Sequence, residues 1–116
     1  MNIDSTKYHL SESLDIANER PSVGFIVLNT DFTFERDFVR MYTEQKPNYD
    51  FYFNRIHFAN PMTPESLAAI GDDLSESAAG ILPNYDLDLV VFNCTSSSSI
   101  VGDDAIEIAI NESKPT

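Results

Sequence analysis

Leu87-Asp88-Leu89-Val90-Val91-Phe92-Asn93-Cys94-Thr95-Ser96-Ser97-Ser98-Ser99 is the most informative stretch of the chain, because an apolar run stops in it at the only cysteine. The run has the length and β-branched content of a buried strand, and small hydroxyl residues follow it. In open parallel sheets, ligands bind beyond the carboxyl ends of the strands, where loops pass into helix N-termini. We therefore expect Cys94 and the hydroxyl residues to face such a crevice.

The composition is that of one small acidic domain. The 116 residues suffice for a single core, and the net charge of -12 repels nucleic-acid backbones and anionic membrane surfaces. The longest apolar run, residues 23–28, is too short to span a bilayer, and we expect no secretory leader. One cysteine forms no internal disulfide and cannot build a zinc site with two distant histidines, so we predict no metal and a reducing, cytoplasmic setting.

The first part of the chain predicts a polar lead-in, residues 1–20, before a domain of residues 21–116. Weak apolar spacing within residues 8–16 predicts a short helix or turn on the outside of the domain. The continuous apolar run 23–28 is typical of a strand buried on both faces. Asp31 and Thr33 are then N-cap candidates for an amphipathic helix that ends before Pro47.

The second part of the chain continues the alternation of strands and helices. Residues 50–58 predict an aromatic strand, and Thr63-Pro64 begins a helix with an N-cap and a proline at its first position. The apolar stripe along this helix is Leu67, Ile70, Leu74, Ala78 and Ile81. A third strand begins at Leu87, and a last helix begins near Asp103. The alternation of Ile106, Ile108 and Ile110 leaves a strand open for that last segment.

This order of elements predicts an α/β fold. Three strands joined by helices imply a parallel sheet with right-handed crossovers and helices on its faces, and a fourth strand is possible. Such a thin sheet has two edges of unpaired backbone groups, which proteins usually cover. We therefore expect a homo-oligomer, or a partner surface supplied by further residues.

Four segments carry a family resemblance through their order and spacing. They are Gly24-Phe25-Ile26-Val27-Leu28, Thr33 with Glu35-Arg36-Asp37-Phe38, Thr63-Pro64-Glu65-Ser66-Leu67, and Cys94-Thr95-Ser96 with Val101-Gly102-Asp103. They resemble the first half of the aspartate/glutamate racemase superfamily, in the branch of arylmalonate decarboxylase and maleate cis-trans isomerase. The racemase-like proteins of ectoine utilisation are the most similar, since they share the Thr-x-Glu-Arg-Asp-Phe pattern and the Cys-Thr-Ser run.

The resemblance implies a cofactor-independent racemase or isomerase with two flavodoxin-like lobes, of which this chain is the first. The substrate, a small carboxylate, would sit between the lobes, and each lobe would offer one cysteine. Cys94 would be the catalytic cysteine of this lobe, while Thr95 and Ser96 would hold the carboxylate. A second lobe would follow the present residues, or a second copy would take its place.

The resemblance also assigns the loop after the first strand to the substrate pocket. Asn29, Thr30 and Asp31 would line the side opposite Cys94. Asp31 stands where maleate isomerases carry an asparagine, which favours a substrate with a nearby amino group. The chain alone would lack half of the active site and be inactive as a racemase or isomerase, because Cys94 alone cannot complete an inversion.

The residues themselves leave alternatives open. A thiol beneath a helix N-terminus is placed in a field that favours thiolate, the useful base or nucleophile, but free cysteine is also a common small core residue. The serines at 96–99 predict either a flexible loop or an anion cradle, and Asp31 is a helix cap, a ligand group or both. At the level of function, the alternative to an enzyme lobe is a non-catalytic module that binds a carboxylate or a partner subunit.

Overall fold

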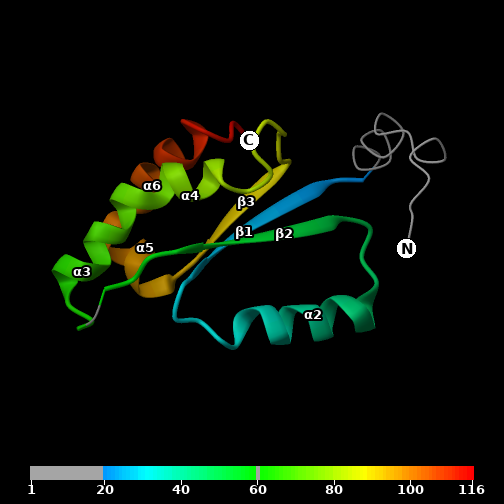
Figure 1. Cartoon of the computed structure of the whole chain (residues 1–116), viewed down its shortest axis with the longest axis horizontal. Coiled ribbons are helices and arrows are strands. Elements are labelled where there is room, and N and C mark those ends of the chain that lie inside the picture. Colours follow the sequence, from blue (N-terminus) through cyan, green and yellow to red (C-terminus); the bar gives the residue numbers. More distant parts are fainter. Residues whose placement is uncertain (1–19, 60) are drawn as a thin grey trace, which may run out of the picture.

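The computed structural model describes residues 20–59 and 61–116, and these form an α/β fold around a parallel sheet (Figure 1). The strands are β1 (Ser22–Leu28), β2 (Asp50–Ile56) and β3 (Leu89–Asn93), in the spatial order β2-β1-β3. The predicted fold class and the parallel sheet are confirmed. The predicted lead-in lies outside the described residues, except for Arg20.

The central strand β1 is the most buried, as its continuous apolar run predicts. Phe25, Ile26 and Val27 are buried, and β1 pairs in parallel with both neighbours. Gly24 lies between Tyr52 of β2 and Val90 of β3. A Cβ there would come within 2.7 Å of a Leu87 methyl carbon, so the glycine lets the segment before β3 pack directly on the strand.

One face of the sheet is covered by α2 (Phe34–Gln45), which has the predicted bounds (Figure 1). Phe34, Phe38 and Tyr42 of this helix pack on aromatic rings of β1 and β2, with Phe25 and Phe38 centred 4.7 Å apart. Aromatic pairs at such spacing add stabilisation beyond the area they bury. The helix nevertheless buries no residue fully, because it covers only the β1–β2 side of this face.

The opposite face is covered by α3 (Pro64–Ala69), the 3-10 helix η2 (Ile70–Asp73), α4 (Leu74–Ala79), α5 (Thr95–Val101) and α6 (Asp103–Asn111). Thr63 caps α3 with the predicted geometry, through a reciprocal pair of hydrogen bonds with Ser66. Every residue of the predicted apolar stripe is buried in the core. The single predicted helix is instead three short pieces, and Ile81 lies beyond them.

Two predicted strand bounds need correction, because the second strand ends at Ile56 rather than at residue 58 and the third begins at Leu89 rather than at Leu87. Of the two alternatives left open for the serines at 96–99, the flexible loop is excluded, because residues 95–101 form α5. Ser97 is fully buried there and donates a 2.6 Å hydrogen bond to the carbonyl of Leu67, which ties α5 to α3.

The last segment is a helix, so the open alternative of a strand at residues 103–111 is excluded. Ile110 faces the core and Ile106 packs against it, while Ile108 is exposed. Across the described residues, every helix is too short or too polar to cross a bilayer.

Candidate functional site

The parallel register brings two predicted loops to the same edge of the sheet. Val27 near the end of β1 pairs with Asn93, the last residue of β3. The loop after β1 and the start of α5 therefore meet beyond the carboxyl ends of adjacent strands, the usual ligand position in such sheets. A depression of about 420 Å³ lies there; its lining residues are Asp31, Phe34, Phe92, Asn93, Cys94, Thr95 and Ser98.

Cys94 lies at the junction of β3 and α5. It is the N-cap residue of α5, has an extended backbone (φ -150°), and is half-buried. Its carbonyl accepts the first helical hydrogen bond, from the N–H of Ser98 at 2.9 Å. The N–H groups of the first turn have no partner within a helix, so they are available to a ligand or to the sulfur. A helix N-terminus is thus present at Cys94, in addition to the helix start near Asp103 that the sequence predicts.

Asp31 faces the same depression and also caps the start of α2 from two positions before Thr33, which is the N-cap residue but makes no capping bond with its own side chain. Its Oδ1 accepts hydrogen bonds from the backbone N–H groups of Thr33 at 2.8 Å and Phe34 at 2.9 Å. These two bonds, that of Phe34 first, hold the pKa of Asp31 below its ordinary value, and Arg55 contributes in the same direction. Asp31 is therefore an anion on the rim of the depression. It can cap α2 and still present its carboxylate to a ligand, so the two predicted roles are compatible.

Arg55 of β2 fixes the loop that carries Asp31. Its Nη1 donates to the carbonyl of Leu28 at 3.0 Å and to that of Asp31 at 2.7 Å. Its Nη2 forms an ion pair with Glu35 at 2.9 Å. A planar guanidinium can make these contacts together because its donors form a rigid fork. The loop is thereby tied to β2 on one side and to the first turn of α2 on the other.

The sequence prediction missed four residues that line the depression, namely Phe34, Phe92, Asn93 and Ser98, and Asn93 is the one with a buried amide. Its Nδ2 is buried and has no hydrogen-bond partner among the described residues. A buried donor without a partner is uncommon in native structures and calls for an explanation, such as a ligand or a water. The signal available in the sequence was an amide side chain directly before the cysteine at a strand end.

The structure does not bring all predicted site residues together. Asp31, Cys94 and Thr95 line the depression, whereas Asn29, Thr30 and Ser96 are exposed and lie outside its lining. The Asn29 side chain is directed to the end of β2, where its Oδ1 accepts from the N–H of Phe58 at 3.0 Å and its Nδ2 lies 3.3 Å from His57 Nδ1.

Comparison with protein-family models, with curated proteins and with solved structures found no match to this chain. The resemblance to the racemase superfamily therefore stays a prediction from the residues quoted above. The function proposed below depends on the geometry around Cys94.

Proposed function

We propose that this chain is one lobe of a cofactor-independent, thiol-based racemase or isomerase that acts at the carbon next to a carboxylate. The supporting observation is that one depression is lined by Cys94, the anionic Asp31 and Asn93, whose amide has no partner among residues 20–59 and 61–116. A thiol, a carboxylate and an amide donor suit a small amino acid, whose ammonium would pair with Asp31. Its carboxylate would accept hydrogen bonds from Asn93 Nδ2 and the N–H of Thr95.

In the proposed step, the Cys94 thiolate removes the proton from the carbon between the ammonium and the carboxylate. The S–H bond forms, the C–H bond breaks, and its electron pair moves into the carboxylate, which becomes enediolate-like. Donors placed at that carboxylate stabilise the charge that develops there. The α-carbon of this enediolate-like intermediate is then reprotonated by the same thiol.

One thiol on one face returns the proton to the side from which it came. Inversion needs a second acid on the opposite face, and the 116 residues contain a single cysteine. We therefore infer that the complete reaction uses a second lobe or a second copy of the chain, placed over the carboxyl ends of β1 and β3. A reducing, cytoplasmic setting belongs to the same proposal, because the thiol must stay unoxidised.

The test is the reactivity of Cys94 toward iodoacetamide, measured by mass spectrometry of the intact chain. The reference is a variant that combines Cys94→Ser with Ser99→Cys, which places an exposed thiol on the same helix. Cys94 should alkylate several-fold faster than this reference despite its partial burial, because only thiolate reacts. Aspartate or diaminobutyrate should slow the reaction of Cys94 and leave the reference unchanged. A slower Cys94 without ligand protection would contradict the proposal.

The second candidate is a non-catalytic module that binds a carboxylate, and the lone thiol favours it, since one acid cannot complete an inversion. Such a module would show ligand protection of Cys94 without any exchange of the substrate proton. The two candidates thus differ in one observable, the fate of that proton in heavy water.

A further inference from the structure

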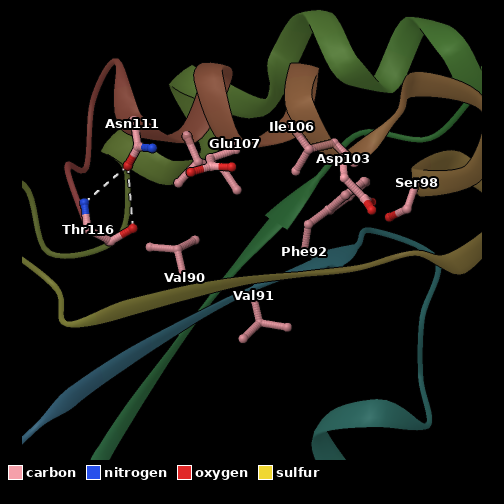
Figure 2. A pocket seen from close by; sticks show the side chains of 10 residues that line it. Val90, Val91, Phe92, Ser98, Asp103, Ile106, Glu107, Asn111 and Thr116 are labelled. Atoms are coloured by element: carbon pink, nitrogen blue, oxygen red, sulfur yellow. Dashed lines mark hydrogen bonds between the residues drawn. The ribbon is translucent and has the colours of Figure 1, made fainter.

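A second groove runs along the free edge of β3, between this strand and α6 (Figure 2). Its volume is about 330 Å³, and its apolar walls are Val90, Phe92, Ile106 and Ile110. Figure 2 shows Val90 and Phe92 directed toward α6, whereas Val91 is directed to the other side of the sheet. On that other side Leu89 is 51% exposed. The edge of β3 is therefore bordered by apolar surface on both faces.

The backbone of this edge is also available for pairing. Among the described residues β3 pairs only with β1, so one side of Leu89–Asn93 presents unpaired N–H and C=O groups. Natural sheet edges are usually protected by charged residues, prolines or bulges. The other edge strand, β2, carries Asp50 and Arg55, but β3 contains no charged residue and no proline.

The surroundings of the groove are uniformly acidic. Asp103 and Glu107 of α6 line it, and neither forms an ion pair with another described residue. Residues 56–113 contain ten Asp and Glu and no Lys or Arg. The next cation, Lys114, is buried, and its Nζ donates to the carbonyls of Leu82 and Tyr85. No exposed lysine or arginine of this half of the fold offsets the acids.

We propose that the β3–α6 groove binds an extended polypeptide segment in which lysine or arginine alternates with apolar residues. The segment adds to the sheet as a strand beside β3, so that its alternate side chains face opposite sides. On the α6 side, long basic side chains lay their methylene stems on Ile106 and Ile110 and place their charges at Asp103 and Glu107. On the other side, apolar side chains cover Leu89 and Val91.

Charge distinguishes this occupant from a second copy of the chain. Pairing two β3 edges would bring two acidic grooves together, so that Asp103 and Glu107 of one copy meet the same acids of the other. Like charges facing each other across an interface oppose association. A basic segment is instead attracted by the negative charges of these acids. This proposal does not depend on the reaction proposed for Cys94.

The test uses the full chain and a fluorescent peptide, Lys-Val-Lys-Val-Lys-Val, with binding followed by anisotropy. Binding should shift the amide NMR signals of residues 89–93 and leave those of β2 in place. Affinity should fall by tenfold or more when peptide nitrogens that face β3 are methylated, because the strand hydrogen bonds are lost. It should also fall for Lys-Ser-Lys-Ser-Lys-Ser and for Glu-Val-Glu-Val-Glu-Val, and with added salt.

One variant and its control test the acids that line the groove. Glu107→Gln should weaken binding about two- to fivefold, the range of an exposed ion pair. Glu76→Gln on α4 is the matched control, since this acid lies in the same half of the fold but outside the groove, and should change nothing. Equal binding of the methylated and unmethylated peptides would overturn the proposal. So would a dimer of the chain alone whose dissociation on dilution shifts the signals of residues 89–93.

Discussion

Arg55 donates a 2.7 Å hydrogen bond to the carbonyl oxygen of Asp31, the residue whose carboxylate faces the depression at Cys94. A side chain from β2 therefore sets the position of a candidate ligand group between β1 and α2. The same guanidinium reaches the carbonyl of Leu28 and the carboxylate of Glu35. Hydrogen bonds from the sheet thus fix this loop, although it lies on the surface.

Arg55→Gln should loosen this loop. We expect a loss of about 1–2 kcal/mol in the free energy of unfolding, a value reduced for the partial exposure of the ion pair. Arg36→Gln is the matched control, because among the described residues Arg36 pairs only with its neighbour Asp37, at 3.3 Å, and its loss should change stability by less than about 0.5 kcal/mol. Urea denaturation measures both. Equal effects of the two substitutions would show that Arg55 does not hold the loop.

Asp31→Ala should remove the cap of α2 and cost about 1 kcal/mol at neutral pH. The pKa of Asp31 is lowered in the folded state, so its ionised form contributes stability above the ordinary value of 3.8. That contribution is lost as the pH falls through the lowered folded value. The stability gap between wild type and Asp31→Ala should therefore narrow below pH 3.8. Asp31→Asn retains an acceptor and should therefore recover most of the lost stability at neutral pH. A difference in the free energy of unfolding between wild type and Asp31→Ala that does not change with pH would contradict this account.

Asn93→Leu should abolish ligand binding without lowering the stability of the fold. Since Asn93 Nδ2 is buried without a partner among the described residues, an apolar side chain of similar size should leave stability unchanged or raise it. Ligand protection of Cys94 should disappear. Asn54→Leu is the control, because Asn54 Nδ2 donates to the carbonyl of Ser77 at 2.8 Å, and its loss should cost about 1–2 kcal/mol. A marked destabilisation by Asn93→Leu would mean that its amide has a structural partner.

Ser97→Ala should destabilise the fold by about 1–2 kcal/mol, because it removes the buried bond from α5 to the carbonyl of Leu67. Ser99→Ala on the same helix is exposed and should be neutral or slightly stabilising, since alanine favours helices. Thermal denaturation compares the two variants. If both behave alike, α5 is not anchored through Ser97.

The parts of the fold that the sequence predicted are those with consistent local signals. The apolar run of β1, and Pro47 after α2, define their elements without help from distant residues. The serine run left its structure open, because serine favours turns, whereas the tertiary bond of Ser97 stabilises a helix there. The break of the α3–α4 segment at Ile70–Asp73 was not predicted, although the spacing of its buried residues was.

The candidate site was predicted in part for a related reason. Asp31 and Cys94 follow parallel strands, so their meeting at one sheet edge follows from the βαβ order. Asn29 was misplaced because its side chain bonds to the backbone of Phe58 on β2, a contact between residues far apart in the chain. Asn93 was missed because its position before Cys94 is a weak signal, and its burial without a partner among the described residues depends on the folded structure.

The measurement that tests the central claim most directly is the exchange of the substrate's α-proton in heavy water. The chain is incubated with aspartate and with diaminobutyrate, and deuterium at the α-carbon is followed by NMR and chiral chromatography. A single thiol on one face predicts slow deuterium incorporation with retained configuration, abolished by Cys94→Ser and strongly reduced by Asn93→Leu. The contradicting result is deuterium incorporation no faster than in the Cys94→Ser variant, under conditions where these ligands protect Cys94 from alkylation. The chain would then be a binding module without catalytic activity.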